Sequence, residues 1–120
     1  MNPFARLFAI ILLSAVALPV AAQNYPTRPV RVIIAFPPGS ATDIIGRVIA
    51  TKVTEIWGQQ AVADNRGGAG GSIASLTAAK AAPDGYTLLI NSNAHVVNPP
   101  MYAKLPYDTL KDFTDLMPLV

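Results

Sequence analysis

Hydrophobic residues gather in three short runs that have the character of strands. The runs cover residues 30–36 and 86–90, with a weaker third run at residues 60–64. The first two runs are almost continuously apolar, whereas a strand with one face in water would alternate apolar and polar positions. The pattern therefore predicts three strands of a parallel sheet whose two faces are both covered by helices.

Two helical segments separate the predicted strands. Apolar residues between positions 44 and 57 recur at spacings of three and four, and charged residues fall largely between them. This is the pattern of an amphipathic helix, with Asp43 expected as its N-cap and Gly58 as its end. A second helix is expected over about residues 71–81, before a turn at residues 83–85.

The predicted order is strand, helix, strand, helix, strand, with short connections. This is a βαβαβ unit with right-handed crossovers, one half of a doubly wound parallel sheet in the α/β class. Residues 91–108 are rich in Asn and Pro and are expected to form a long surface loop, and the tail 113–120 has the apolar character of a further strand. Doubly wound sheets usually contain more strands, so we expect the chain to be the front part of something longer.

Residues 1–22 have the organisation of a secretory signal peptide. Arg6 is the only charge, residues 7–20 are nearly all apolar, and Val20-Ala21-Ala22 supplies small residues at the end. A transmembrane anchor is the competing interpretation, but the uninterrupted apolar run is shorter than the roughly 20 residues that span a bilayer. We therefore expect cleavage after Ala22 and an exported chain of residues 23–120 that forms one small domain.

The amino-acid composition and the net charge exclude several classes of function. The chain has no cysteine, which excludes a thiol nucleophile, a thiolate metal site and stabilising disulfides. Its formal net charge is +2, or +1 once Arg6 of the leader is removed. A nucleic-acid-binding protein needs a clustered basic face, so we expect no nucleic-acid partner.

The strongest candidate site is the loop that joins the first strand to the first helix, at residues 37–43. Ligands of open α/β sheets bind outside the carboxyl ends of the strands, and backbone N–H groups at a helix N-terminus suit an anion. Gly39 permits close approach of the backbone, and Ser40 and Thr42 offer hydroxyl groups. Asp43 is better placed as a cap than as a ligand contact, because its carboxylate would repel an anion. The alternative is an ordinary connection that binds nothing.

The glycine-rich run at residues 65–72 resembles a phosphate cradle without its specific features. Ser72-Ile73 stands where a P-loop has Lys followed by Ser or Thr. The run also opens the second βα unit, whereas a dinucleotide fingerprint opens the first. We expect a tight turn that lets helix and strand pack closely, with Arg66 as a rim charge, and no nucleotide cofactor.

A third candidate, residues 91–95, follows the last predicted strand and shares a sheet edge with the first loop. The small polar side chains of Ser92 and Asn93 suit hydrogen bonds to a ligand. His95, the single histidine, makes a poor metal site without cysteines or a nearby carboxylate, and its alternative role is a loop residue bonded to the backbone. Ser92 and Ser40 lack the G-x-S-x-G elbow, so an exported α/β hydrolase is a weaker hypothesis.

Several short blocks, in order along residues 23–120, carry a resemblance to a known family. The blocks are Tyr25-Pro26-Thr27-Arg28-Pro29-Val30-Arg31, Phe36-Pro37-Pro38-Gly39, Thr42-Asp43, Gly58-Gln59, Asp64-Asn65-Arg66, Gly68-Ala69-Gly70-Gly71, Pro83-Asp84-Gly85-Tyr86-Thr87-Leu88-Leu89, Asn98-Pro99, Leu105-Pro106-Tyr107-Asp108 and Lys111-Asp112-Phe113. With these blocks the chain resembles the N-terminal part of the Bug family of extracytoplasmic solute receptors, the substrate-binding proteins of tripartite tricarboxylate transporters.

The resemblance implies a periplasmic binding protein-like fold of type II, with residues 23–120 as the incomplete N-terminal lobe of a two-domain clamshell. It implies a monomeric periplasmic receptor that is not an enzyme and uses no cofactor or metal. The ligand would be a small carboxylate, such as a di- or tricarboxylate or an amino acid, passed on to the transporter's membrane subunits. Carried over by motif, the ligand-binding residues are Phe36, Pro38, Gly39, Ser40, Ala41, Thr42 and Asp43, with Ser92, Asn93 and His95 beside them.

Two departures from the family pattern keep a second hypothesis open. Ser40 stands where the family usually has a second glycine, so its Cβ narrows the approach to the backbone or its hydroxyl adds a contact. The second domain is also missing from the sequence, and a clamshell closes around its ligand by hinge motion between two domains. The alternative to a working receptor is therefore a truncated, non-functional fragment of one.

Overall fold

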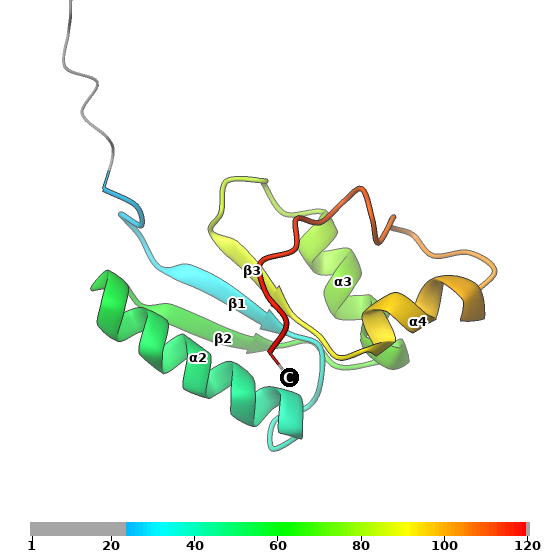
Figure 1. The fold of residues 1–120 in the computed structure, drawn as a ribbon, viewed down its shortest axis with the longest axis horizontal. Helices are drawn as coiled ribbons and strands as arrows, with labels where there is room; N and C mark the ends of the chain where they lie inside the picture. The colour runs from blue at the N-terminus through cyan, green and yellow to red at the C-terminus, as the bar shows by residue number, and fades with distance from the viewer. Residues whose placement is uncertain (1–23, 120) are drawn as a thin grey trace, which may run out of the picture.

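A three-stranded parallel sheet forms the centre of the computed structural model, which describes residues 24–119 (Figure 1). Its strands lie in the order β2-β1-β3, with Val30 opposite Ala61 in one ladder and Arg31 opposite Thr87 in the other. The central strand is therefore the first one in the sequence, and all three carboxyl ends share one edge. The strands are β1 (Val30–Ile34), β2 (Ala61–Asn65) and β3 (Thr87–Ile90).

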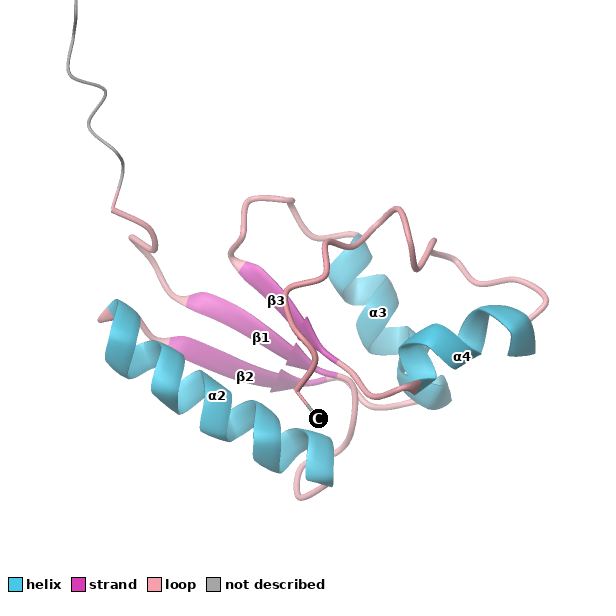
Figure 2. Ribbon diagram, viewed as in Figure 1, coloured by secondary structure: helices cyan, strands magenta, loops and turns pink. Residues whose placement is uncertain are grey.

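Helices cover both faces of this sheet, as the continuous apolar runs predict (Figure 2). The helical elements are α2 (Ala41–Trp57), the short 3₁₀ helix η1 (Ala69–Gly71), α3 (Ser72–Ala79) and α4 (Ala94–Met101). Ala50 of α2 packs with Val32 and Ile34 on one face. Ala74 of α3 packs with Ile33 on the other. Because successive strand side chains point to opposite faces, both sets of β1 residues are buried in a core.

The start of α2 differs from the expectation that Asp43 would cap it. Ser40 is the N-cap, and its hydroxyl accepts a hydrogen bond from the Asp43 backbone N–H at 3.2 Å. Both residue types are good caps, and only the turn after β1 decides that the helix begins at Ala41. The other end is as predicted, because Gly58 adopts a left-handed conformation and its N–H donates to the Thr54 carbonyl.

The segment after β3 contains a helix in place of the expected long loop. Residues 94–101 form α4 even though Pro99 and Pro100 lie inside it, and proline is the poorest helix former. Asn98 of α4 is buried, and its side-chain amide donates to the Gly70 carbonyl at 2.9 Å. A contact with a segment distant in the sequence therefore supports a helix that composition disfavours.

The tail gives a second correction, because residues 113–119 form no strand. Leu116 and Met117 stay largely exposed. Apolar content does not suffice for a strand, since each strand needs a neighbour that pairs with its backbone groups.

The predicted signal peptide, residues 1–22, lies outside the described residues. Between residues 24 and 119, none of the helices has both the length and the apolar character that crossing a membrane requires.

Candidate functional site

Three loops meet at the carboxyl edge of the sheet, around the end of β1. The loop after β2 approaches the loop after β1 so closely that a Cβ on Gly67 would lie 3.1 Å from Pro37 Cδ. Gly71 fits between Ala35 and Asn91, the residues that directly follow β1 and β3. The glycine-rich run thus serves as a close-packed turn, and the candidate segments at residues 37–43 and 91–95 share the edge on which the sequence places them.

A buried carboxylate organises the loop after β1. The side chain of Asp43, which is only 3% exposed, accepts a hydrogen bond from the Gly39 backbone N–H at 2.8 Å and another from Asn65 Nδ2 at 2.8 Å. Arg47, one helical turn further on, donates to both carboxylate oxygens at 2.9 and 3.1 Å. The bonds from Asn65, Gly39 and Arg47, in that order, hold the pKa of Asp43 down at about 2. The carboxylate is therefore ionised at any physiological pH.

Asn65 and Arg47 belong to this network, although sequence reasoning did not select either as a site residue. Asn65 ends β2, and its Nδ2 also donates to the Phe36 carbonyl at 2.9 Å. Arg47 donates to Asn65 Oδ1 at 2.9 Å. The spacing of four residues between Asp43 and Arg47 was a signal for one of these pairs. The position of Asn65 beside them follows only from the strand pairing.

The turn into α2 contains two backbone N–H groups that donate to no acceptor among the described residues. Of the five N–H groups at residues 39–43, three bond to acceptors inside the protein, namely those of Gly39, Ser40 and Asp43. Within the described residues, the N–H groups of Ala41 and Thr42 have no such acceptor. These two consecutive groups lie in the first turn, at the positive end of the helix dipole. The arrangement suits one anionic group with two oxygens.

The segment after β3 uses its polar side chains largely for its own turn. The Ser92 N–H donates to Asn91 Oδ1 at 2.8 Å, and the Ser92 hydroxyl accepts from the Ala94 N–H at 3.2 Å. Asn93 is exposed. The hydrogen bonds of the described residues include none between residues 91–95 and residues 36–43, so the two segments are neighbours on one edge without a direct polar link.

His95 lies in the first turn of α4 and not in a loop, and its backbone N–H donates to the Ser92 carbonyl. Its Nδ1 is 3.2 Å from the buried Ser75 Oγ. The Tyr107 ring stacks at 6.2 Å between centroids, and the Phe113 ring meets it edge-on at 4.8 Å. Burial lowers the pKa of His95. The described part of the chain contains no group of three or more potential metal ligands.

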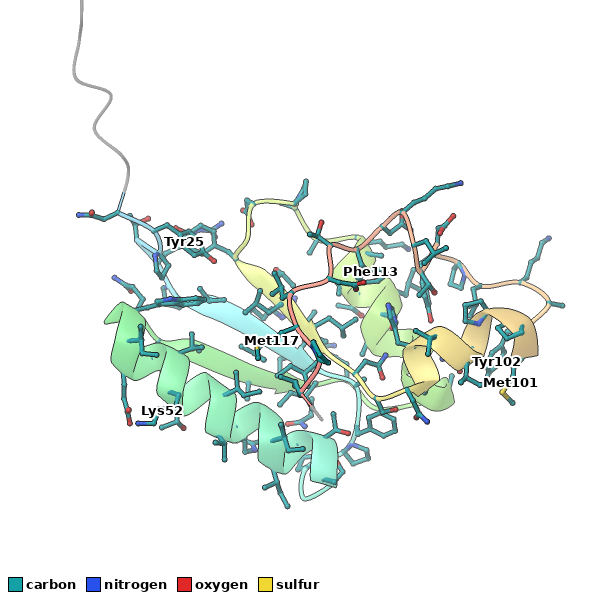
Figure 3. The ribbon with its side chains drawn as sticks, in the orientation of Figure 1. Tyr25, Lys52, Met101, Tyr102, Phe113 and Met117 are labelled. Atoms are coloured by element: carbon teal, nitrogen blue, oxygen red, sulfur yellow. The ribbon has the colours of Figure 1, made fainter. Side chains whose placement is uncertain are left out.

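The opposite edge of the sheet carries a separate aromatic cluster with a structural role. Tyr25 lies there, far from Met101 at the end of α4 and from Tyr102, which follows it (Figure 3). Its ring meets Trp57 at 5.6 Å and Tyr86 at 5.1 Å. These contacts, and a hydrogen bond from the Tyr25 hydroxyl to the Gly85 carbonyl, hold the segment before β1 against the end of α2 and the turn before β3.

Sequence comparisons place this arrangement in a known family. The family model described as tripartite tricarboxylate transporter family receptor matches residues 45–120. A UPF0065 protein of Pseudomonas sp. (strain P51) is 43% identical over 115 residues, and BugT of Bordetella pertussis is 42% identical over 113 residues. These matches cover 93% and 89% of this chain but only 34% and 35% of the relatives. The chain thus spans about a third of the length of those relatives.

Solved structures share the fold. The periplasmic binding protein BugD matches with a TM-score of 0.71 and 35% identity, over 74% of this chain and 30% of its own. MatC from Rhodopseudomonas palustris with bound malate matches with a TM-score of 0.70 and 37% identity, over 75% and 31%. An R. palustris protein with adipate matches with a TM-score of 0.68 and 40% identity, over 71% and 29%. The parallel sheet and its helices are therefore part of a periplasmic binding protein fold, and the chain belongs to the tripartite tricarboxylate transporter receptor family, the Bug family that its sequence blocks predict.

Proposed function

We propose that this chain is the N-terminal lobe of a periplasmic receptor that captures a small dicarboxylate for a tripartite tricarboxylate transporter. In this proposal residues 1–22 are a cleaved leader and residues 23–120 form one jaw of a two-domain clamp. Two similar proteins were solved with malate and with adipate, which are both dicarboxylates, and this supports the choice of ligand class.

The observation that carries the proposal is the pair of available N–H groups at Ala41 and Thr42. They open a helix of 17 residues, long enough for its peptide dipoles to place about half a positive charge at this end. A ligand carboxylate has two oxygens that match two adjacent donors. Each hydrogen bond to a charged group contributes about 1.5–3 kcal/mol, so two such bonds anchor one end of the acid.

The other residues of the proposed site belong to the same loop or follow β3 at the same edge of the sheet. Phe36, Pro38 and Gly39 shape the turn that leads into the helix, and Ser40 orients it by capping. Ser92 and Asn93 form the neighbouring wall on the same edge, and His95 supports that wall from α4. The carboxylate of Asp43 is bound by Arg47 and Asn65. These partners offset the negative charge of Asp43, so its repulsion of an anionic ligand is weak.

A proline substitution tests the two donors directly. Ala41 occupies the first helical position, where proline is well tolerated and only removes the N–H. The preceding Ser40 has φ −70° and ψ 159°, the extended conformation that a residue before proline prefers. Ala41→Pro should therefore keep the helix and weaken dicarboxylate binding by about 10- to 100-fold.

The assay is isothermal titration of the full-length gene product with a panel of dicarboxylates that includes malate and adipate, supported by thermal unfolding. A ligand that binds only the folded state raises the melting temperature. Ala41→Ser, which keeps the N–H, is the matched control and should bind like the wild type. Absence of both heat and a melting shift with every acid in the panel would refute the proposed function. Equal affinity of the proline variant would refute the assigned donors.

A further inference from the structure

The helix N-terminus that the proposed function assigns to a ligand already holds one carboxylate of its own. Asp43 accepts the Gly39 N–H at 2.8 Å, and this donor would otherwise point from the same turn as those of Ala41 and Thr42. An acidic side chain at the third helical position usually reaches back to the N-cap N–H. Here it reaches one residue further, into the loop, and the N-cap N–H of Ser40 bonds to the Pro37 carbonyl instead.

We infer that Asp43 is a positioning residue of the anion site: with Asn65 and Arg47 it occupies the Gly39 N–H, closes the loop and leaves one pair of N–H groups for one ligand carboxylate. The inference rests on the proposed function, because it concerns how the same helix end selects its ligand. Asp43 itself does not touch the ligand.

The loop is closed by a single amide. Asn65 Nδ2 donates both to the Phe36 carbonyl at 2.9 Å and to Asp43 Oδ1 at 2.8 Å. Phe36 and Asp43 stand at the two ends of the loop, so one side chain from β2 ties both ends together. A loop held at both ends keeps the two N–H groups of residues 41 and 42 in a fixed relation before the ligand arrives, which lowers the ordering cost of binding.

Charge complementarity explains why a buried anion is compatible with an anion site. Arg47 donates to both oxygens of Asp43 and also to Asn65 Oδ1. The carboxylate, the guanidinium and the amide thus satisfy one another, and the local charge is close to balanced. A buried charge without such partners would be strongly unfavourable.

Replacing Asp43 with Asn distinguishes a positioning role from simple electrostatics, because the two predict opposite changes in ligand affinity. Removing a negative charge near an anion should tighten binding if charge alone matters. The amide of an Asn, however, cannot accept from Gly39, Asn65 and Arg47 together, and its NH₂ group would face other donors. Positioning therefore predicts weaker binding, by about tenfold or more for the loss of one charge-assisted bond to the ligand.

The experiment measures dicarboxylate affinity of the full-length gene product by calorimetry for the wild type, Asp43→Asn and a matched control. The control is Asp64→Asn, which removes a carboxylate near the same end of β2 that bonds to Arg31 and Arg66 and not to the loop. We expect Asp43→Asn to bind about tenfold or more weakly and Asp64→Asn to bind at least as well as the wild type. Circular dichroism and the NMR signal of the Gly39 amide report folding and release of that N–H.

Two further variants keep the inference testable. Asn65→Ala leaves Asp43 its bonds to Gly39 and Arg47 but unties the loop, so it should also weaken binding if Asp43→Asn fails to fold. The exchange Asp43→Asn with Asn65→Asp keeps a donor and an acceptor between the two positions but leaves the Phe36 carbonyl without its donor, so it should also bind more weakly than the wild type. A wild type that binds no acid overturns the proposed function and this inference together. A wild type that binds, with Asp43→Asn and Asn65→Ala binding equally well or more tightly, overturns the inference alone.

Discussion

Gly71 offers a quantitative test of how the three loops pack at the carboxyl edge. Its φ is +83°, and a Cβ added there would lie 2.7 Å from Asn91 Oδ1 and 3.3 Å from Ala35 Cβ. Gly71→Ala therefore introduces two separate penalties, one from the backbone conformation and one from the crowded space. Gly58→Ala is the matched control, because Gly58 also has a positive φ, +66°, but has nothing within 4 Å of the added Cβ.

The two penalties can be estimated separately. The left-handed conformation costs an alanine about 1–2 kcal/mol. Replacing glycine also lowers the conformational entropy of the unfolded chain, which stabilises the folded state by about 0.4–1 kcal/mol. Gly58→Ala should therefore lower the free energy of unfolding by about 1 kcal/mol. Overpacking against Asn91 and Ala35 adds about 1–3 kcal/mol. Gly71→Ala should thus lower it by about 2–4 kcal/mol.

Urea unfolding of the full-length gene product, followed by circular dichroism, measures both variants against the wild type. A typical free energy of unfolding is about 5–15 kcal/mol, so both variants should remain folded in water. Equal destabilisation by the two substitutions would refute the reasoning, since it would mean that the space between Ala35 and Asn91 is not tight. A Gly71→Ala variant as stable as the wild type would refute the left-handed conformation as well.

Three further predictions concern polar groups that the fold buries wholly or in part. Ser75→Ala should lower the free energy of unfolding by about 1–3 kcal/mol, because the buried hydroxyl accepts from Asn91 Nδ2 at 3.1 Å and its loss leaves that NH₂ group without its acceptor. Ser72→Ala, which removes a hydroxyl at the surface of the same helix, should lose less, and equal losses in urea unfolding would contradict this. The folded-state pKa of Asp43, about 2, lies below its ordinary value of 3.8, so the unfolded state binds more protons and stability should fall as the pH drops from about 4 to about 2. Asp43→Asn should lack this component of the acid unfolding curve, and an unchanged curve would count against the network. Burial lowers the pKa of His95 below 6.5, so the neutral form is favoured on folding and stability should decline as the pH falls below about 6.5. NMR titration of the imidazole tests this directly, and a pKa at or above 6.5 would contradict it.

Local patterns predict the sheet and its two main helices well because burial on both sides of a strand leaves a direct trace in the sequence. Residues 30–36 contain no polar residue apart from Arg31. In the structure, α2 packs on one face of β1 and α3 packs on the other. The end of α2 at Gly58 was also predictable, because left-handed C-caps favour glycine for steric reasons.

The errors arise where a distant contact overrides a local preference. Asn and Pro between residues 91 and 108 indicate a loop, yet the bond from Asn98 to Gly70 supports α4. The apolar tail at residues 113–119 forms no strand, since none of the three strands between residues 24 and 119 pairs with it. At the candidate site, the strand–glycine–helix order identifies the loop at residues 37–43, but Ser40 and not Asp43 caps the helix, because both residue types are equally acceptable caps by composition.

The sequence by itself determines the α/β class, the βαβαβ order and the family, since these depend on periodicity, on turn residues and on short blocks that stand side by side in the chain. It also places a helix N-terminus at the carboxyl end of the first strand. Only the tertiary structure decides which backbone donors remain there. Asn65 reaches Asp43 across 22 positions of sequence, through the pairing of β1 with β2. That contact holds the carboxylate that accepts from the Gly39 N–H, whereas the N–H groups of Ala41 and Thr42 have no acceptor among the described residues. The sequence does not show this, because a hydrogen bond depends on distance in space and not on distance along the chain.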